Sequence, residues 1–432
     1  MISHVPGPPN LLLGAYDISL LGYSADEYFV SGTATASSGE RADYTTRVVT
    51  LTPPEFNGTV VVEWLNVSGG IDAPAVWFMA HRELVRAGYG YIAVSVQRVG
   101  VEGGDNLVGI DMSLKAQDAE RYSPLNHPGD AYAYDIYTRM GRLVRDGEFG
   151  LRPEYVLAVG ESQSAMFLTT YVNDVDAEAA VYDGFLVHSR FGTAAPLDGS
   201  SALETTTPAP FRDDLRVPVL TVITETDLLD GHLLGYRHAR RPDDEHLRAW
   251  ELPGSAHADN YTIKVGFIDS GAASLTELAA AYAPTDQLMG QQLSYYINFA
   301  PQHHYVLQAA VAALHRWVRD GVPPSTAPPL ELADGALVLD ANGLATGGVR
   351  IPWVDVPAAR TSGTAPDETP MSFLFGSGEV FDAATLAALY PAGSGDYLAR
   401  FETALDQTIR HGFLLAADRA EILDLAAAMY PG

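Results

Sequence analysis

The segment GESQS at positions 160–164 places Ser162 between an apolar run and a helical pattern. On a tight strand-to-helix turn, the residues two before and two after a nucleophile must be small, and Gly160 and Ser164 meet this condition. Such a turn exposes the serine hydroxyl at the N-terminal end of the following helix, where the helix dipole favours an anionic attacker. We therefore predict that Ser162 is a nucleophile, and the alternative is an ordinary surface turn.

A serine nucleophile needs a base, and the base needs an acid that orients it. Glu225 and Asp227 follow the apolar run 217–224, and His257 lies among small residues after the run 248–252. The order along the chain is serine, acid, histidine, each after a predicted strand. We expect His257 to be the general base. Asp227, the carboxylate further from the strand end, is the expected acid, with Glu225 in reserve.

The oxyanion that forms when a serine attacks a carbonyl needs two backbone N–H groups. We expect one from Gln163, directly after the nucleophile. The other should come from the glycine-containing loop 65–70, in which Asn66 and Val67 are the candidates. A flexible turn without this role is the alternative for that loop.

Four further side chains are candidates for a substrate pocket. Gln97 and Arg98 follow the apolar run 89–96, at the carboxyl end of a predicted strand. His303 and His304 directly precede a long helical pattern. No HExxH or similar metal-ligand spacing occurs in the sequence, so we expect no metal site.

These residues need a scaffold that brings them together. Apolar runs that are typical of buried strands occur at 44–53, 58–67, 89–96, 154–160, 180–189, 217–224 and 246–254. Helical patterns lie between several of them, at 75–87, 131–144 and 165–173. This alternation predicts an α/β fold with a mostly parallel central sheet and helices on both faces. Ligands of such sheets bind at the carboxyl ends of the strands, which the predicted site residues follow.

The alternation of strands and helices stops after His257. Residues 1–260 are predicted to form the α/β core, and the aromatic-rich stretch 261–303 is predicted to form a helical cap over the site. Residues 304–325 should contain the last core helix, because an apolar helical pattern ends there at the stop signal GVPP. The remainder, 326–432, is expected to wrap the surface as a C-terminal extension that ends in helices.

Composition narrows the class of partner. The 432 residues include no cysteine, which excludes disulfides, thiolate metal sites and thiol nucleophiles. With 54 acidic against 26 basic residues, the formal charge of -28 argues against nucleic acids and anionic membranes as partners. No segment reaches the roughly 20 apolar residues that cross a bilayer, and the N-terminus does not resemble a signal peptide. We therefore expect a cytoplasmic protein, and a homo-oligomer stays open.

With these residues in view, the sequence resembles the large, mostly bacterial family of alpha/beta hydrolase domain-containing proteins. The similarity covers residues from about 60 to 363. It rests on segments that recur in order: VSVQRVGV at 94–101, ERYSPLNHPGDAYAYDIY at 120–137, AVGESQSA at 158–165, VITETD at 222–227, WELPGSAHAD at 250–259 and NGLATGGVRIP at 342–352. The resemblance implies an α/β-hydrolase fold without a cofactor, and it implies Ser162, Asp227 and His257 as a catalytic triad.

Motif, chain order and resemblance together predict a serine hydrolase of the carboxylesterase type. It would cleave a carboxylic ester or lactone through an acyl-enzyme intermediate. The aromatic residues of the predicted cap suggest a small-molecule ester with an apolar or aromatic group, and the alternative is that they only pack the cap. Two alternatives stay open: an acyltransferase or lyase that uses the same triad, and a non-catalytic, hydrolase-like binding protein.

Overall fold

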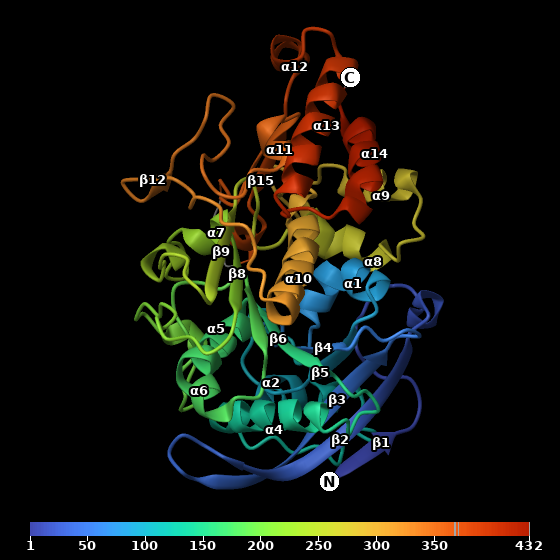
Figure 1. Ribbon diagram of the computed structural model, residues 1–432, viewed down its shortest axis with the longest axis vertical. Coiled ribbons are helices and arrows are strands. Elements are labelled where there is room, and N and C mark those ends of the chain that lie inside the picture. The colour runs from blue at the N-terminus through green and yellow to red at the C-terminus, as the bar shows by residue number, and fades with distance from the viewer. Residues whose placement is uncertain (367–368, 370, 432) are drawn as a thin grey trace.

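A nine-stranded sheet forms the centre of the computed structural model, which describes residues 1–366, 369 and 371–431 (Figure 1). Its strands, in chain order, are β1 Ile2–Val5, β2 Ser24–Thr35, β3 Arg41–Thr52, β4 Thr59–Trp64, β5 Gly90–Val94, β6 Tyr155–Glu161, β7 Gly184–His188, β8 Val219–Thr224 and β9 Leu247–Leu252. They stand side by side in the order β1-β2-β3-β5-β4-β6-β7-β8-β9. Neighbours from β5 to β9 are parallel, and only β1, β2 and β3 add antiparallel pairs. The predicted mostly parallel sheet is confirmed.

The long hairpin of β2 and β3 lies towards one edge of this sheet. β3 contains most of the predicted run 44–53, whereas β1 and β2 have no counterpart among the predicted strands. β2 mixes buried, half-buried and exposed positions along its length. A half-exposed strand carries polar residues, so a search for continuous apolar runs does not find it.

Helices cover both faces of the sheet, as predicted (Figure 1). The main ones are α1 Ala75–Arg86, α4 Ala133–Arg145, α5 Gln163–Thr170 and α10 Gln302–Asp320. Val61 of β4 packs in one core cluster with residues of α1 and α10, and its neighbours Val60 and Val62 pack in another with residues of α4 and α5. Successive residues of a strand point to opposite faces, so this strand is buried on both sides.

Short elements follow β9, in the stretch predicted to be a helical cap. They are a π-helical turn η6 Tyr261–Val265, α8 Gly266–Ile268, α9 Leu275–Tyr282 and the hairpin strands β10 Gln287–Leu288 and β11 Gln291–Gln292. The hairpin was not expected, because strands of two residues leave no periodic pattern. The long helix α10 then begins two residues before the predicted range 304–325 and ends before Gly321, the left-handed residue of the GVPP stop signal.

The C-terminal part contains two small hairpins and several helices. They are β12 Leu332–Ala333, β13 Ala336–Leu337, α11 Pro352–Asp355, β14 Ala359–Ser362, β15 Ser377–Val380, α12 Ala383–Leu389, α13 Ser394–Arg410 and α14 Arg419–Met429. In Figure 1, α13 and α14 lie at the opposite end of the molecule from the N-terminal strands. Phe401 and Leu425 are buried in the same cluster as the core residue Trp77, so this part adds to the core as well as covering it.

Residues 367, 368, 370 and 432 of the predicted extension lie outside the described part of the chain. The division into a core, a cap and an extension stays a prediction. Shorter connecting helices complete the fold: α2 Arg98–Glu102, α3 Leu114–Gln117, α6 Asp176–Ala179 and α7 Glu225–Leu228. Among the helices that the structure describes, none combines the length and the apolar character that crossing a membrane requires.

Candidate active site

Ser162 occupies the sharp turn between β6 and α5, with backbone angles φ 57° and ψ -120°. Few residues other than glycine adopt a positive φ, so the turn is strained. Its amide N–H donates to the His188 carbonyl at 3.0 Å, which ties the turn to the neighbouring strand. A side chain at Gly160 would come within 3.2 Å of the Ser164 carbonyl oxygen. The expected need for a small residue at this position therefore has a visible steric cause.

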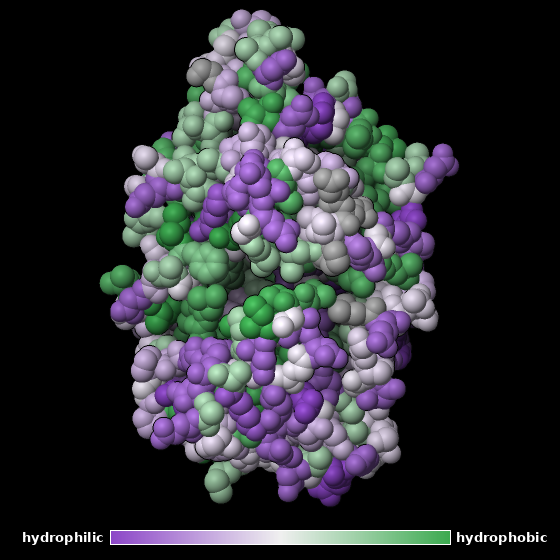
Figure 2. Space-filling view, turned by 180° about the vertical axis from the view of Figure 1, so that it is seen from behind, coloured by the Kyte–Doolittle hydropathy of each residue, from purple (hydrophilic) through white to green (hydrophobic). Residues whose placement is uncertain are grey.

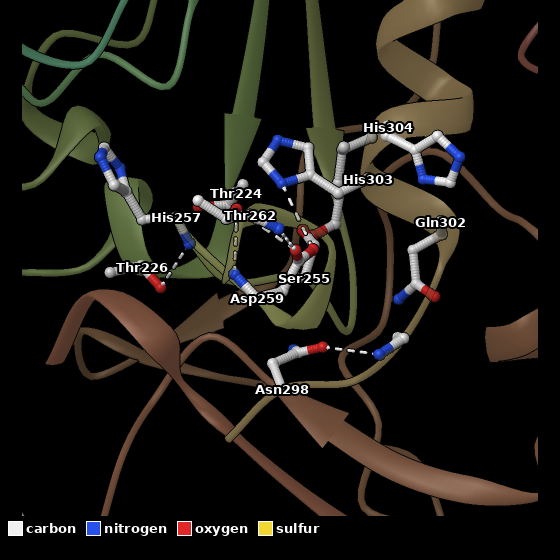
Figure 3. A network of polar contacts seen from close by, with 12 residues as sticks. Thr224, Thr226, Ser255, His257, Asp259, Thr262, Asn298, Gln302, His303 and His304 are labelled. Atoms are coloured by element: carbon white, nitrogen blue, oxygen red, sulfur yellow. Dashed lines mark hydrogen bonds and ion pairs between the residues drawn. The ribbon is translucent and has the colours of Figure 1, made fainter. Parts of the chain in front are cut away.

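His257 lies between Ser162 and Asp227, on the loop after β9. Its Nε2 is 2.9 Å from Oγ of Ser162, and its Nδ1 is 2.6 Å from Oδ1 of Asp227. The backbone N–H of His257 donates to Oγ1 of Thr226 at 3.2 Å (Figure 3). Burial alone would lower the pKa of His257, but the neighbouring carboxylates of Asp227 and Glu161 outweigh it and raise that pKa.

Asp227 is fixed by the first turn of α7. Its Oδ2 accepts hydrogen bonds from the backbone N–H and the hydroxyl group of Thr224, both at 2.8 Å. Thr224 in turn caps the helix by accepting from the N–H of Asp227. This reciprocal cap leaves Oδ1 free to face the imidazole of His257.

Glu225, the reserve acid, points elsewhere. Its carboxylate accepts from the backbone N–H groups of Gly254 at 2.6 Å and Gly363 at 2.7 Å, and from the Ser362 hydroxyl at 3.0 Å. Burial raises the pKa of Glu225 to about 7, against the lowering effect of these hydrogen bonds. The structure therefore brings Asp227, and not Glu225, to His257.

The three candidates for the oxyanion site differ in their hydrogen bonding. The backbone N–H of Asn66 donates to the Ala73 carbonyl at 3.0 Å, so it is engaged within its own loop. The N–H of Val67 reaches only the side-chain oxygen of Gln163, at 3.5 Å. Gln163 is the first residue of α5, where a backbone N–H has no partner inside the helix. Val67 and Gln163 are thus better suited than Asn66 to bind an oxyanion.

A cavity of about 460 Å³ opens onto Ser162, Gln163 and His257. Apolar side chains from distant parts of the chain line most of it: Leu12, Ile71, Phe78, Met79, Leu107, Met166, Phe191, Leu233, Phe267, Met289, Phe373 and Leu374. Phe191 stacks on the ring of His257 with a centroid distance of 5.3 Å. Figure 2 shows apolar residues gathered around a hollow in the middle of one face of the molecule. The cavity has the size and the lining of a small-molecule site.

The four residues predicted to line the pocket lie elsewhere. None of them is among the described residues that line the cavity. Gln97 is buried and bonds to the Trp64 indole at 3.1 Å and to Asp130 at 3.2 Å, and the N–H of Arg98 also donates to Asp130. Asp130 thus holds the start of α2 against the turn that precedes α4, away from the cavity.

His303 and His304 are buried at the start of α10 (Figure 3). His303 bonds to His188 through a 2.7 Å contact between the two Nε2 atoms, and His304 stacks on Tyr261. Burial lowers the pKa of His303 to about 4 and that of His304 to about 3. Both histidines are therefore neutral at physiological pH.

Most residues of the cavity wall were not among the predictions, and two of them lie at the strand ends beside Ser162. His188 lines the cavity at the end of β7, and Glu161 lines it beside the nucleophile. The signal for Glu161 was present in the sequence, because this acidic residue directly precedes the predicted nucleophile in the GESQS segment. Over the residues that the structure describes, no group of three or more His, Cys, Asp or Glu side chains could hold a metal ion.

Comparisons with known proteins bear on this geometry. A family model described as an alpha/beta hydrolase domain matches residues 5–424, so it extends beyond the resemblance seen from 60 to 363 on both sides. No curated protein matches the chain.

Solved structures that resemble the chain include three hydrolases. The esterase Pf2001 of Pyrococcus furiosus has a TM-score of 0.29 and 11% identity, over 57% of this chain and 87% of its own. A protein of Klebsiella pneumoniae described as a dienelactone hydrolase has a TM-score of 0.32 and 14% identity, over 59% of this chain and 95% of its own. The serine hydrolase XC6422 of Xanthomonas campestris has a TM-score of 0.31 and 13% identity, over 52% of this chain and 83% of its own.

Proposed function

Because the chain belongs to the alpha/beta hydrolase domain family and has its fold, we propose that it is a serine hydrolase that cleaves a carboxylic ester or lactone. The observation that carries the proposal is the unbroken chain of hydrogen bonds from Ser162 through His257 to Asp227. A buried acid, an oriented imidazole and a hydroxyl that faces the cavity from a strained turn are the parts that nucleophilic acyl transfer needs.

The proposed reaction has two steps. His257 takes the proton of Ser162 through Nε2 while Oγ attacks the ester carbonyl carbon, and the N–H groups of Gln163 and Val67 bind the oxyanion. The alcohol leaves with the proton from His257, and Ser162 holds the acyl group. Water, deprotonated by His257, then attacks the acyl carbon, and His257 returns the proton to Oγ of Ser162 as the acid is released. Asp227 holds the neutral imidazole in the tautomer that accepts at Nε2, and it remains bonded to Nδ1–H when the ring is protonated.

The lining of the cavity supports an apolar group on the substrate. Aromatic and aliphatic side chains supply most of the wall around Ser162. Burying an apolar group against them is favourable, whereas a charged group would lose its hydration without a partner. We therefore propose a small ester or lactone with an aliphatic or aromatic acyl or alcohol part.

The test is the Ser162→Ala variant with short p-nitrophenyl esters as substrates. We expect hydrolysis to fall to the background rate while circular dichroism shows an unchanged fold. A fluorophosphonate probe should label the wild-type protein and leave the variant unlabelled. Undiminished hydrolysis by the folded variant would remove Ser162 from the role of nucleophile.

A further inference from the structure

The carboxyl group of Glu161 lies beside the base of the proposed triad without being part of it. Its Oε1 is 3.4 Å from Nε2 of His257, the nitrogen that also faces Ser162. The Asn66 side chain holds the other oxygen, Oε2, by donating from Nδ2 at 3.1 Å, and the same group donates to the Glu161 carbonyl at 3.0 Å. The loop that carries the oxyanion candidates thus fixes this carboxyl group towards the imidazole.

The two nitrogens of His257 therefore face two different carboxyl groups. In the resting enzyme Nδ1–H donates to Asp227, and the lone pair of Nε2 is left for the hydroxyl of Ser162. After proton transfer from Ser162, both nitrogens carry hydrogen and the ring is positive. A carboxylate 3.4 Å from Nε2 attracts this positive ring, and a buried site screens that attraction weakly. The attraction exists in full only while the oxyanion exists, so it favours the transition state over the resting enzyme.

We propose that Glu161 is a positioning residue of the site, a second carboxylate that must be ionised for full activity because it stabilises the imidazolium of His257 from the side of Nε2. This inference rests on the proposed function, since it assumes that His257 takes a proton from Ser162. The inference explains why an acidic residue directly precedes the nucleophile.

The surroundings of Glu161 make its ionisation depend on pH. Burial raises its pKa to about 7, His257 lowers that pKa, and Asp227 of α7 raises it. Glu161 in turn raises the pKa of Glu63 of β4, and His188 of β7 is the register partner of Glu161 on the neighbouring strand. Both Glu161 and His257 must therefore lose a proton before the site is active. Two coupled ionisations give log(kcat/KM) a slope against pH that approaches about two on the acid side, instead of about one.

The decisive variant is Glu161→Gln, which keeps the shape and an acceptor for Asn66 but cannot ionise. We expect the slope of its acid limb to fall from about two to about one. The midpoint of this limb should move to lower pH, because loss of a negative neighbour lowers the pKa of His257. At pH above about 8, kcat should fall on the order of tenfold with little change in KM. An acid limb of the same slope and midpoint as that of the wild type would overturn the inference.

Two further variants separate charge from structure. Glu63→Gln removes another buried carboxyl group, one that accepts from the N–H groups of Val76 and Trp77 and from the Tyr91 hydroxyl, so its acid limb should keep the wild-type slope. Glu161→Asp keeps the negative charge but places it farther from Nε2 of His257, because its side chain is one methylene shorter. This variant should keep the steep acid limb and have a lower kcat. Loss of the steep limb in both Glu63→Gln and Glu161→Asp would contradict the inference. An acid limb with a slope of about one in the wild type would also contradict it.

Failure of the inference and failure of the proposed function give different results. If Ser162→Ala remains active, the proposed function fails whatever Glu161 does. If Ser162→Ala is inactive and Glu161→Gln behaves as the wild type, only the role of Glu161 fails. Fluorophosphonate labelling of Glu161→Gln checks that the variant retains a folded site.

Discussion

Asp227 and Glu225 lie two residues apart on α7 and have different partners. Asp227 faces Nδ1 of His257 at 2.6 Å, whereas Glu225 binds two backbone N–H groups and a hydroxyl. We expect Asp227→Asn to lower kcat on the order of 10⁴-fold, because asparagine no longer holds the working tautomer of His257. Glu225→Gln should cost far less activity. Steady-state kinetics with a short ester checks the ranking, and the reverse order would make Glu225 the acid.

The backbone strain at Ser162 permits a second prediction at the scale of one residue. Ser162→Ala and Ser162→Gly both remove the hydroxyl group, but only glycine adopts a φ of 57° and a ψ of -120° with little strain. The glycine variant should therefore be more stable than the alanine variant by about 1 kcal/mol. Chemical denaturation of the two inactive proteins measures the difference. Equal stability would show that the turn stores little strain.

At the scale of elements, the loop after β8 is tied to the C-terminal part of the chain. Glu225 accepts from the N–H of Gly363 at 2.7 Å, and the hydroxyl of Thr226 donates to the Gly363 carbonyl at 2.6 Å. A side chain at Gly363 would come within 2.5 Å of the N–H nitrogen of Thr226, so the two segments approach closely. The segment that follows β14 thus supports the loop that carries the acid.

This contact predicts how the stability of Glu225→Gln depends on pH. The variant loses one acceptor in a buried site, which costs about 1–3 kcal/mol at pH near 5. In the wild type burial raises the folded pKa of Glu225 to about 7, so its contribution is fully present below the unfolded pKa and is lost as pH rises through about 7. The gap in stability between the two proteins should therefore narrow by pH 8. Urea denaturation at both pH values tests this, and a constant gap would contradict it.

At the scale of the whole molecule, the apolar cavity collects side chains from the N-terminal segment, the sheet edge and the C-terminal part. Ala75, at the start of α1, is half-buried and lines it. Ala75→Phe should fill part of the space and lower kcat/KM for an octanoate ester by about tenfold, with little effect on an acetate ester. Parallel kinetics with p-nitrophenyl esters of both acids measures the change.

The matched control is Ala279→Phe. Ala279 is also half-buried on a helix but lines a second cavity, away from Ser162. The Ala279→Phe variant should hydrolyse both esters at the wild-type rates. The cavity next to Ser162 would not be the substrate pocket if Ala75→Phe lowered kcat/KM equally for both esters. The same conclusion would follow if Ala279→Phe changed the ratio of kcat/KM between the octanoate and the acetate ester.

The sequence by itself determined the parallel strands, the main helices and the chain order of the proposed triad. Continuous apolar runs predicted β4 to β9, because a parallel strand is buried on both faces and leaves an unbroken pattern. Small residues at Gly160 and Ser164 predicted the strained turn, since the chain itself comes within contact distance there. These features are local, and local sterics and burial periodicity can be read from neighbouring residues. The catalytic roles of Ser162, Asp227 and His257 stay predictions.

Only the tertiary structure decided which loops meet. The sequence left Asp227 and Glu225 as alternative acids. The structure distinguishes them because Glu225 accepts from the N–H of Gly363, which is remote along the chain. Gln97, His303 and His304 lie at the ends of the expected elements, yet their side-chain partners hold them away from the cavity, and the exposed Arg98 does not line it either. The half-exposed strand β2 left no distinctive run. Each of these outcomes depends on contacts between segments far apart in sequence, and a local pattern carries no information about such contacts.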